Sequence, residues 1–186
     1  MLHTKHSGRA EAEAAALVLG ACPGVVELVD ALDGVVRTRW VEGRTLASVV
    51  DLAAEEVAGV SAAIASTLAG LHERGVVHGG LDPTHVLLTP EGRPVLCSFG
   101  RGGHPEDDIA ALGAIMAALV DTAAAIPGHG PAGRRHRALG PMLAPPAGPA
   151  LASVAAAARD ADPRARPTAR ELATAIAEQV PAAHLP

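Results

Sequence analysis

Apolar residues recur at helical spacing in five stretches of the chain. The clearest is Glu55–Arg74, where apolar residues lie three or four positions apart and Gly75 follows as a helix stop. A second stretch, from Glu106 or Asp107 to about Thr122, is almost wholly apolar, which is typical of a helix buried on several sides. We expect further helices over Glu11–Leu19, Leu151–Arg159 and Thr168–Gln179, the last with a Thr168–Glu171 capping box.

Two β-branched runs near the start of the chain predict a hairpin. Val25–Leu32 and Val35–Trp40 are joined by Asp33-Gly34, a dipeptide that supplies the positive φ angles of a tight two-residue turn. Met1–His6 is polar and predicts at most the stub of a further strand. The sheet in this part of the chain is therefore expected to be small.

The middle of the chain predicts short elements and loops. Thr45 is expected to cap a short helix that ends near Leu52. Ile126–Pro149 is rich in Pro, Gly and Arg and predicts a long loop, with or without a short helix. Together the elements indicate one α+β domain. Very short strands are expected over Val76–His78, Val86–Leu88 and Pro94–Cys97, separated by the loop Gly79–Thr84 and the turn Pro90–Gly92.

The amino-acid composition and charge of the chain limit the classes of function that we expect for it. The length of 186 residues suits one domain, and its core must consist mainly of Ala, Val, Leu and Ile because aromatic residues make up only 1%. The net charge of −5, with acids and bases interspersed, speaks against nucleic acid as a partner. Cys22 and Cys97 lie far apart and the histidines lack ligand spacing, so we expect neither a disulfide framework nor a metal site. Neither a membrane-spanning run nor a signal peptide is evident, so we expect a soluble, cytoplasmic protein without a membrane partner.

Four segments of the chain carry recognisable motifs. They read LHERGVVHGGLDPTHVLL over 71–88, LCSFG over 96–100, DIAALG over 108–113 and DPRARPTAREL over 162–172. In order and spacing they resemble the catalytic loop, the DFG motif, the start of the large central helix and the C-terminal signature of bacterial, eukaryotic-like (Hanks-type) Ser/Thr protein kinases. Upstream, Glu13 resembles the glutamate of the family's helix C, and Trp40–Leu46 resembles its hinge.

The resemblance implies a protein kinase-like fold with a mainly helical C-lobe and a reduced N-lobe. The N-lobe is expected over 1–42 as helix C, a short β-hairpin and the hinge, the C-lobe over 43–180, and a tail over 181–186. The resemblance also implies a buried arginine, Arg166, for which Glu106 is one candidate partner. The residues alone favour His78 as a core histidine bonded to the backbone. The family's structural spine is expected to comprise Leu17, Leu28, His78, Phe99 and Asp108.

The catalytic positions of the family are changed in this chain. The catalytic Asp position is Gly80, which has no side chain to act as a base. The magnesium-binding Asn position is His85 and the DFG Asp position is Ser98, so oxygen ligands that magnesium prefers are missing there. Asp82 replaces the loop lysine and reverses its charge. Asp82 and His85 also admit a proton-relay interpretation, although solvated loop side chains explain them more simply. We expect no intact catalytic residue.

The resemblance leaves nucleotide binding open. It places Lys5, Glu13, Thr38, Val41 and Leu87 beside a nucleotide, with Lys5 and Glu13 as the ATP-positioning ion pair. The seven residues between Lys5 and Glu13 are a short span in which to finish a strand, turn and begin a helix. No metal or cofactor is expected, apart from ATP bound without magnesium.

These observations lead to a main hypothesis and two alternatives. The main hypothesis is a catalytically inactive kinase-like domain, a pseudokinase, that acts in signalling as a protein-binding or regulatory module. Its partner is then another protein, because 101–107 is too short for the family's activation segment and its absence leaves apolar surface uncovered. The first alternative is a truncated or divergent Ser/Thr kinase with residual ATP binding. The second is an aminoglycoside-kinase-like phosphotransferase, whose HGD loop shares His78-Gly79 with this chain.

Overall fold

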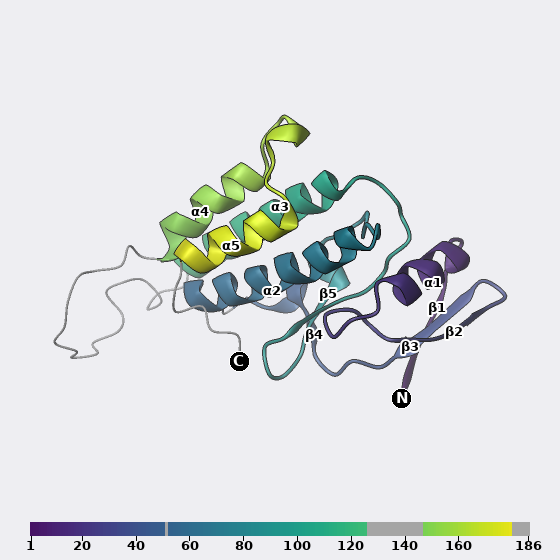
Figure 1. The fold of residues 1–186 in the computed structure, drawn as a ribbon. Coiled ribbons are helices and arrows are strands. Elements are labelled where there is room, and N and C mark those ends of the chain that lie inside the picture. Colours follow the sequence, from purple (N-terminus) through teal and green to yellow (C-terminus); the bar gives the residue numbers. More distant parts are fainter. Residues whose placement is uncertain (51, 126–146, 180–186) are drawn as a thin grey trace.

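The described chain folds into helices and two small sheets. The computed structural model describes residues 1–50, 52–125 and 147–179. One helix and a three-stranded sheet come first, and the remaining helices pack together beside them (Figure 1). The predicted α+β class is confirmed. In the described parts, no helix combines the length and apolar character needed to cross a membrane. The predicted tail over 181–186 lies outside the described residues.

The N-terminal sheet contains a strand that the sequence pattern did not predict. β1 (Leu2–His6) pairs antiparallel with β3 along its whole length, which places β1 at one edge of the order β1-β3-β2. The predicted strand stub is therefore wrong, and the N-terminal part has three strands. β1 was missed because its side chains are mostly exposed, so its formation depends on backbone pairing with β3 and leaves no apolar alternation. The other elements are α1 (Ala10–Leu19), β2 (Leu28–Leu32) and β3 (Val35–Arg39).

The predicted hairpin is confirmed in its turn. Asp33 and Gly34 have φ angles of 51° and 75°, the positive values that a two-residue turn with right-handed twist requires. β2 begins three residues later than predicted, and its pairing with β3 is irregular between Leu28 and Asp30. Val25 instead forms an isolated parallel bridge to Leu96, which connects the hairpin to the second sheet.

The second sheet is formed by three very short strands. β4 (Arg44–Thr45), β5 (Val86–Leu88) and β6 (Pro94–Leu96) lie in that order, all antiparallel. No strand forms over 76–78, because the backbone N–H of His78 donates to the Asp108 carboxylate.

The predicted cap at Thr45 is wrong. Only a single 3-10 turn follows Thr45, over Leu46–Ser48. The Thr45 side chain makes no capping hydrogen bond. The Ser48 hydroxyl instead donates to the Thr45 carbonyl at 2.7 Å. This contact closes the turn locally, so the expected helix to Leu52 does not form.

Four long helices make up the rest of the described chain. Three agree with the predicted helices to within three residues at each end, and Thr168 and Glu171 form the predicted capping box before α5. The fourth starts at Ala147, four residues before the prediction, because Gly148 and Pro149 fall in the first helical turn, where proline's missing N–H has no intrahelical partner to lose. The predicted loop is wrong at 147–149, and 126–146 lie outside the described residues. The helices are α2 (Ala54–Glu73), α3 (Pro105–Ala125), α4 (Ala147–Ala158) and α5 (Ala169–Gln179).

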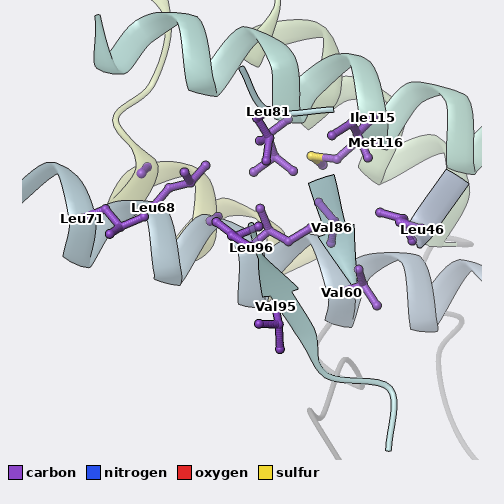
Figure 2. Close-up of a cluster of buried hydrophobic side chains, with 14 of the residues drawn as sticks. Leu46, Val60, Leu68, Leu71, Leu81, Val86, Val95, Leu96, Ile115 and Met116 are labelled. Carbon is purple, nitrogen blue, oxygen red and sulfur yellow. The ribbon is translucent and has the colours of Figure 1, made fainter. Parts of the chain in front are cut away.

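The main core lies between α2, α3 and the second sheet. Figure 2 shows Val60, Leu68 and Leu71 of α2 directed toward strand residues, with Ile115 and Met116 of α3 on the other side. Val86 and Leu96 lie between the helices, whereas Val95, next in the chain to Leu96, points the opposite way as strand alternation requires (Figure 2). Residues of this cluster are almost fully buried, so the short strands are held mainly by packing on the helices.

The N-terminal part is attached to the helices through close backbone contacts. The N–H of Leu96 donates to the Gly24 carbonyl at 2.9 Å, and the N–H of Val26 donates to the Leu96 carbonyl at 3.0 Å. A Cβ at Gly24 would lie 2.2 Å from the Thr67 hydroxyl on α2, so a side chain there is not accommodated. These contacts fix a cleft between the two sheets.

Candidate functional site

A cavity of about 390 Å³ lies in the cleft between the two sheets. This volume is in the range of small-molecule sites in proteins. The five residues predicted to lie beside a nucleotide all line it, although they come from distant parts of the chain. Apolar side chains form much of its wall. The lining comprises His3, Lys5, Glu13, Val26, Val36, Thr38, Arg39, Trp40, Val41, Gly43, Thr45, Thr84, Leu87, Cys97 and Ser98.

Lys5 and Glu13 form an ion pair at the inner end of this cavity. The Lys5 Nζ lies 3.0 Å from the Glu13 Oε1, and the Glu13 side chain is only 5% exposed. The short span between them suffices because the chain turns tightly: the N–H of Ala10 donates to the Ser7 carbonyl, and the N–H of Ser7 donates to the Gly34 carbonyl. The cost of burying the Glu13 carboxylate is offset by this cation.

Gly80, at the position where the resemblance would place the catalytic acid, is covered by an arginine. A Cβ built on Gly80 would lie 2.4 Å from the Arg101 Cδ, so the Arg101 side chain occupies the space beside this glycine. Gly79 is equally close to the backbone of Gly102, at 1.9 Å for a built Cβ, and has a φ of 70°. The segment after Gly100 thus packs directly against the loop.

Asp82 and His85 hold the loop that follows. The Asp82 Oδ1 accepts the N–H of Thr84 at 2.6 Å and caps the 3-10 turn Pro83–His85. Burial opposes ionisation of Asp82, but the hydrogen bonds from Thr84 and the charge of His85 outweigh it and lower the pKa of Asp82. The His85 Nδ1 lies 2.7 Å from the Gly80 carbonyl and 3.0 Å from the Asp82 Oδ2. Since both neighbours accept, Nδ1 carries the proton.

Ser98 lies where the two sheets and α1 meet. Its φ of 67° is left-handed, a conformation that costs a non-glycine residue about 1 to 3 kcal/mol. Its Oγ accepts a long hydrogen bond from the Lys5 Nζ at 3.4 Å. Burial raises the pKa of the neighbouring Cys97 thiol, which favours the neutral form. Ser98 and Cys97 therefore present neutral groups to the cavity.

Behind this loop, Asp108 organises a buried junction. Its carboxylate accepts three hydrogen bonds at 2.9 Å, from the backbone N–H groups of His78 and Gly79 and from the His72 Nε2. Asp108 is 1% exposed, so these donors stand in for lost hydration. Asp107 and Asp108 both lie in the first turn of α3, where acidic side chains are favoured by the helix dipole.

His78 is fully buried, as the interpretation of a core histidine requires. Its Nε2 lies 2.9 Å from the Cys97 carbonyl and so donates, and its ring packs on Phe99 with the centroids 4.5 Å apart. Nδ1 has no partner. Burial lowers the pKa of His78 despite the nearby Asp108, because protonation would place an unpaired N–H in the core.

The remaining predicted structural residues are distributed through the fold. Leu17 is buried and Leu28 is partly buried against the core. The Arg166 Nη1 donates to Glu106 at 3.0 Å, but to its backbone carbonyl and not to its carboxylate. The Arg166 Nε donates to the Asp160 carbonyl at 2.9 Å. The candidate pair of Arg166 with Glu106 is therefore a hydrogen bond between a charged side chain and the backbone.

A second cavity, of about 590 Å³, was missed at the sequence level. It adjoins the first, because Lys5, Glu13 and Ser98 line both. Arg9 and Arg101 also line it, and in the described chain neither side chain has a hydrogen-bond or ion-pair partner. The only sequence signal was the position of Arg101 directly after Phe99-Gly100. The other lining residues are His6, Ser7, Gly8, His85 and Phe99.

The described residues include no cluster of three or more His, Cys, Asp or Glu side chains placed to hold a metal ion. No known protein-family model matches the sequence, and no curated protein matches it significantly. A function for this chain has to follow from its own residues and their geometry.

Proposed function

We propose that this chain is a catalytically inactive, protein kinase-like domain that acts as a protein-binding or regulatory module. One observation carries the proposal. An ion pair suited to positioning phosphate, Lys5–Glu13, borders both cavities. Of the residues at the family's catalytic positions, His85 and Ser98 line the second cavity and Gly80 lies under the Arg101 side chain. The kinase-like fold, the lobes at 1–42 and 43–180 and the signalling role are parts of this proposal.

The chemistry of phosphoryl transfer explains why these residues indicate inactivity. The reaction depends on a positioned base and on metal ions that neutralise the developing charge. Gly80 offers no base, and the Arg101 side chain packs where an acid would extend. His85 and Ser98 offer a ring nitrogen and a neutral hydroxyl, whereas magnesium prefers carboxylate and carbonyl oxygens.

Exposed apolar side chains support a role in binding another protein. Within the described residues, seven of the eight large exposed hydrophobic residues lie in the first 40 positions, on or beside β1, α1, β2 and β3. Exposed apolar side chains concentrated in one part of a chain favour an interaction surface there. The residues are Met1, Leu2, Val18, Leu19, Val29, Leu32 and Trp40.

A second candidate, a divergent kinase with residual ATP binding, is favoured by the first cavity. Its volume and its apolar walls suit a planar heterocycle, and Thr38, Val41 and Leu87 surround the space. Nucleotide binding is compatible with inactivity, because the binding groups and the transferring groups are different residues. We therefore include nucleotide binding in the proposal as a regulatory input.

Thermal-shift titration with ATP, ADP and adenosine, each with and without magnesium, tests this function. A ligand at 100 times its dissociation constant stabilises the folded state by about 2.7 kcal/mol, which is readily measured. We expect stabilisation by a nucleotide without conversion of ATP to ADP. The absence of any shift would remove the regulatory input and leave only protein binding. Magnesium-dependent phosphate release would overturn the proposal as a whole.

A further inference from the structure

The two adjoining cavities differ in polarity. The first presents mostly apolar surface between the sheets, whereas the second presents mostly polar surface and lies toward the start of α1 and the segment after Gly100. Lys5, Glu13 and Ser98 form their common boundary. A single ligand with an apolar ring at one end and a charged group at the other can therefore occupy both.

The second cavity carries a positive charge in a chain that is negative overall. Among its lining residues, Lys5, Arg9 and Arg101 carry three positive charges against the one negative charge of Glu13, which leaves two in excess before His6 and His85 are counted. The whole chain has a net charge of −5. Since acids outnumber bases in the chain, this local excess is opposite to the average surface and favours an anion.

The positively charged side chains of the second cavity are also available to bind an anion. Glu13 is the sole carboxylate among the lining residues in the described chain, and it is already paired with Lys5. Arg101 extends over Gly80, where the missing side chain leaves it room, and no acid neutralises it in the described residues. Arginine binds phosphate through a planar fork of N–H donors, so two unpaired arginines beside one lysine suit a phosphate chain.

We propose that the second cavity binds the phosphate chain of a metal-free nucleoside di- or triphosphate, with Arg9 and Arg101 in place of a metal ion. This inference rests on the proposed nucleotide binding in the first cavity. It requires that magnesium weakens binding. A magnesium ion neutralises two charges of the phosphate chain and finds no free carboxylate among the lining residues, whereas the arginines and Lys5 repel it.

Isothermal titration with ADP and with adenosine, each in EDTA and in excess magnesium, tests the inference. We expect ADP to bind at least about tenfold more tightly than adenosine in EDTA, because charge-assisted hydrogen bonds are gained. Magnesium should weaken the binding of ADP and leave that of adenosine unchanged. Added salt should also weaken ADP binding selectively, because the cavity is open to screening ions.

Variants of the two arginines test whether their side chains bind the phosphate chain of the nucleotide. Arg101→Gln and Arg9→Gln should each lower the affinity for ADP by about tenfold and leave adenosine unchanged. Arg101→Lys should lose less affinity for ADP, because lysine keeps the positive charge and lacks only the planar fork of N–H donors. Arg93→Gln is the matched control, since Arg93 is exposed and lines neither cavity. All four variants should unfold at the wild-type temperature, because no described side-chain partner is lost.

The outcomes separate this inference from the function on which it rests. Adenosine binding with no gain for ADP, or ADP binding strengthened by magnesium, would overturn the metal-free phosphate site and leave nucleotide binding intact. An equal loss in Arg93→Gln would likewise overturn it. Binding of neither ligand would overturn both the phosphate site and the nucleotide pocket.

Discussion

Two neighbouring stretches of the loop after α2 differ in what they contact. The first is hydrogen-bonded to a buried carboxylate, and the second lies beside a cavity. At His78 and Gly79, the backbone donates to a carboxylate whose oxygens are all engaged and which is shielded from water. The next residue, Gly80, instead lies under the side chain of Arg101, and His85 further along lines the second cavity. We therefore expect the fold to depend more on the buried carboxylate of Asp108 than on the groups beside the cavity.

The largest effect should come from removing the buried carboxylate. Asp108→Ala leaves the N–H groups of His78 and Gly79 and the His72 ring without their acceptor in a dry site. We expect a loss of about 3 to 5 kcal/mol in the free energy of unfolding, measured by urea denaturation. The matched control is Asp107→Ala, since Asp107 is exposed and accepts one bond from the His104 N–H. Equal losses of stability in the two variants would show that Asp108 contributes no more to the fold than Asp107 does.

The Lys5–Glu13 pair borders both cavities, and stability should respond unequally to the removal of its two members. Lys5→Met leaves the Glu13 carboxylate buried without its cation, whereas Glu13→Gln leaves a lysine that is 35% exposed and can regain water. We expect Lys5→Met to cost about 1 to 3 kcal/mol in stability and Glu13→Gln to cost clearly less. Thermal unfolding of both variants measures the difference. A larger loss for Glu13→Gln would show that Glu13 stabilises the fold by other contacts.

The pH dependence of stability should report the burial of His78. Because burial lowers its pKa in the folded state, the unfolded chain binds the proton first as the pH falls. The contribution of His78 is therefore fully present above its unfolded pKa of about 6.5 and is lost as the pH falls from there toward the folded value. The slope reaches about 1.4 kcal/mol per pH unit at most.

His78→Gln is the comparison variant for this measurement. Its amide can still donate toward the Cys97 carbonyl but does not titrate. Urea denaturation between about pH 7 and pH 5 should show a shallower loss in His78→Gln than in the wild type. Asp108, Asp82, His72 and His85 lie near the ring and remain in both proteins, so they cancel in the difference. Parallel curves would contradict the assignment.

The smallest effect should come from placing an acid at Gly80, where the kinase resemblance would put one. Gly80→Asp requires only that the flexible Arg101 side chain move, and the new carboxylate can pair with it at the surface. We expect a change in stability within about 1 kcal/mol and no phosphoryl transfer, because His85 and Ser98 are unchanged. The new acid should also lower the affinity for ADP by competing for Arg101. Transfer activity in this single variant would show that the metal-binding positions suffice as they are.

Local sequence signals accounted for much of the fold. The Asp33-Gly34 turn, the stop at Gly75 and the capping box at Thr168 were predictable because each depends on residues adjacent in the chain. β1 was not predictable, since its polar strand is selected by pairing with β3, about 30 positions or more along the chain. Val76–His78 failed as a strand for a related reason: its backbone bonds to Asp108, a residue of α3.

The candidate site was only partly accessible from the sequence. The residues around the first cavity followed from the kinase resemblance, and the structure brings all five together. The tightness of the turn at Ser7, which permits the Lys5–Glu13 pair, depends on a backbone bond to Gly34 in the hairpin. The role of Arg101 was also hidden, because a glycine at 80 signals a missing acid but does not indicate which side chain fills the space.

The central claim is that this chain holds a nucleotide-sized cavity and does not transfer phosphate. The most direct test is incubation of the protein with saturating ATP and magnesium, followed by separation of the nucleotides and analysis of the protein for bound phosphate. We predict that no ADP forms beyond the protein-free rate and that no phosphate is attached to the chain. Magnesium-dependent formation of ADP that disappears in Lys5→Met, and so does not come from a contaminating enzyme, would contradict the claim.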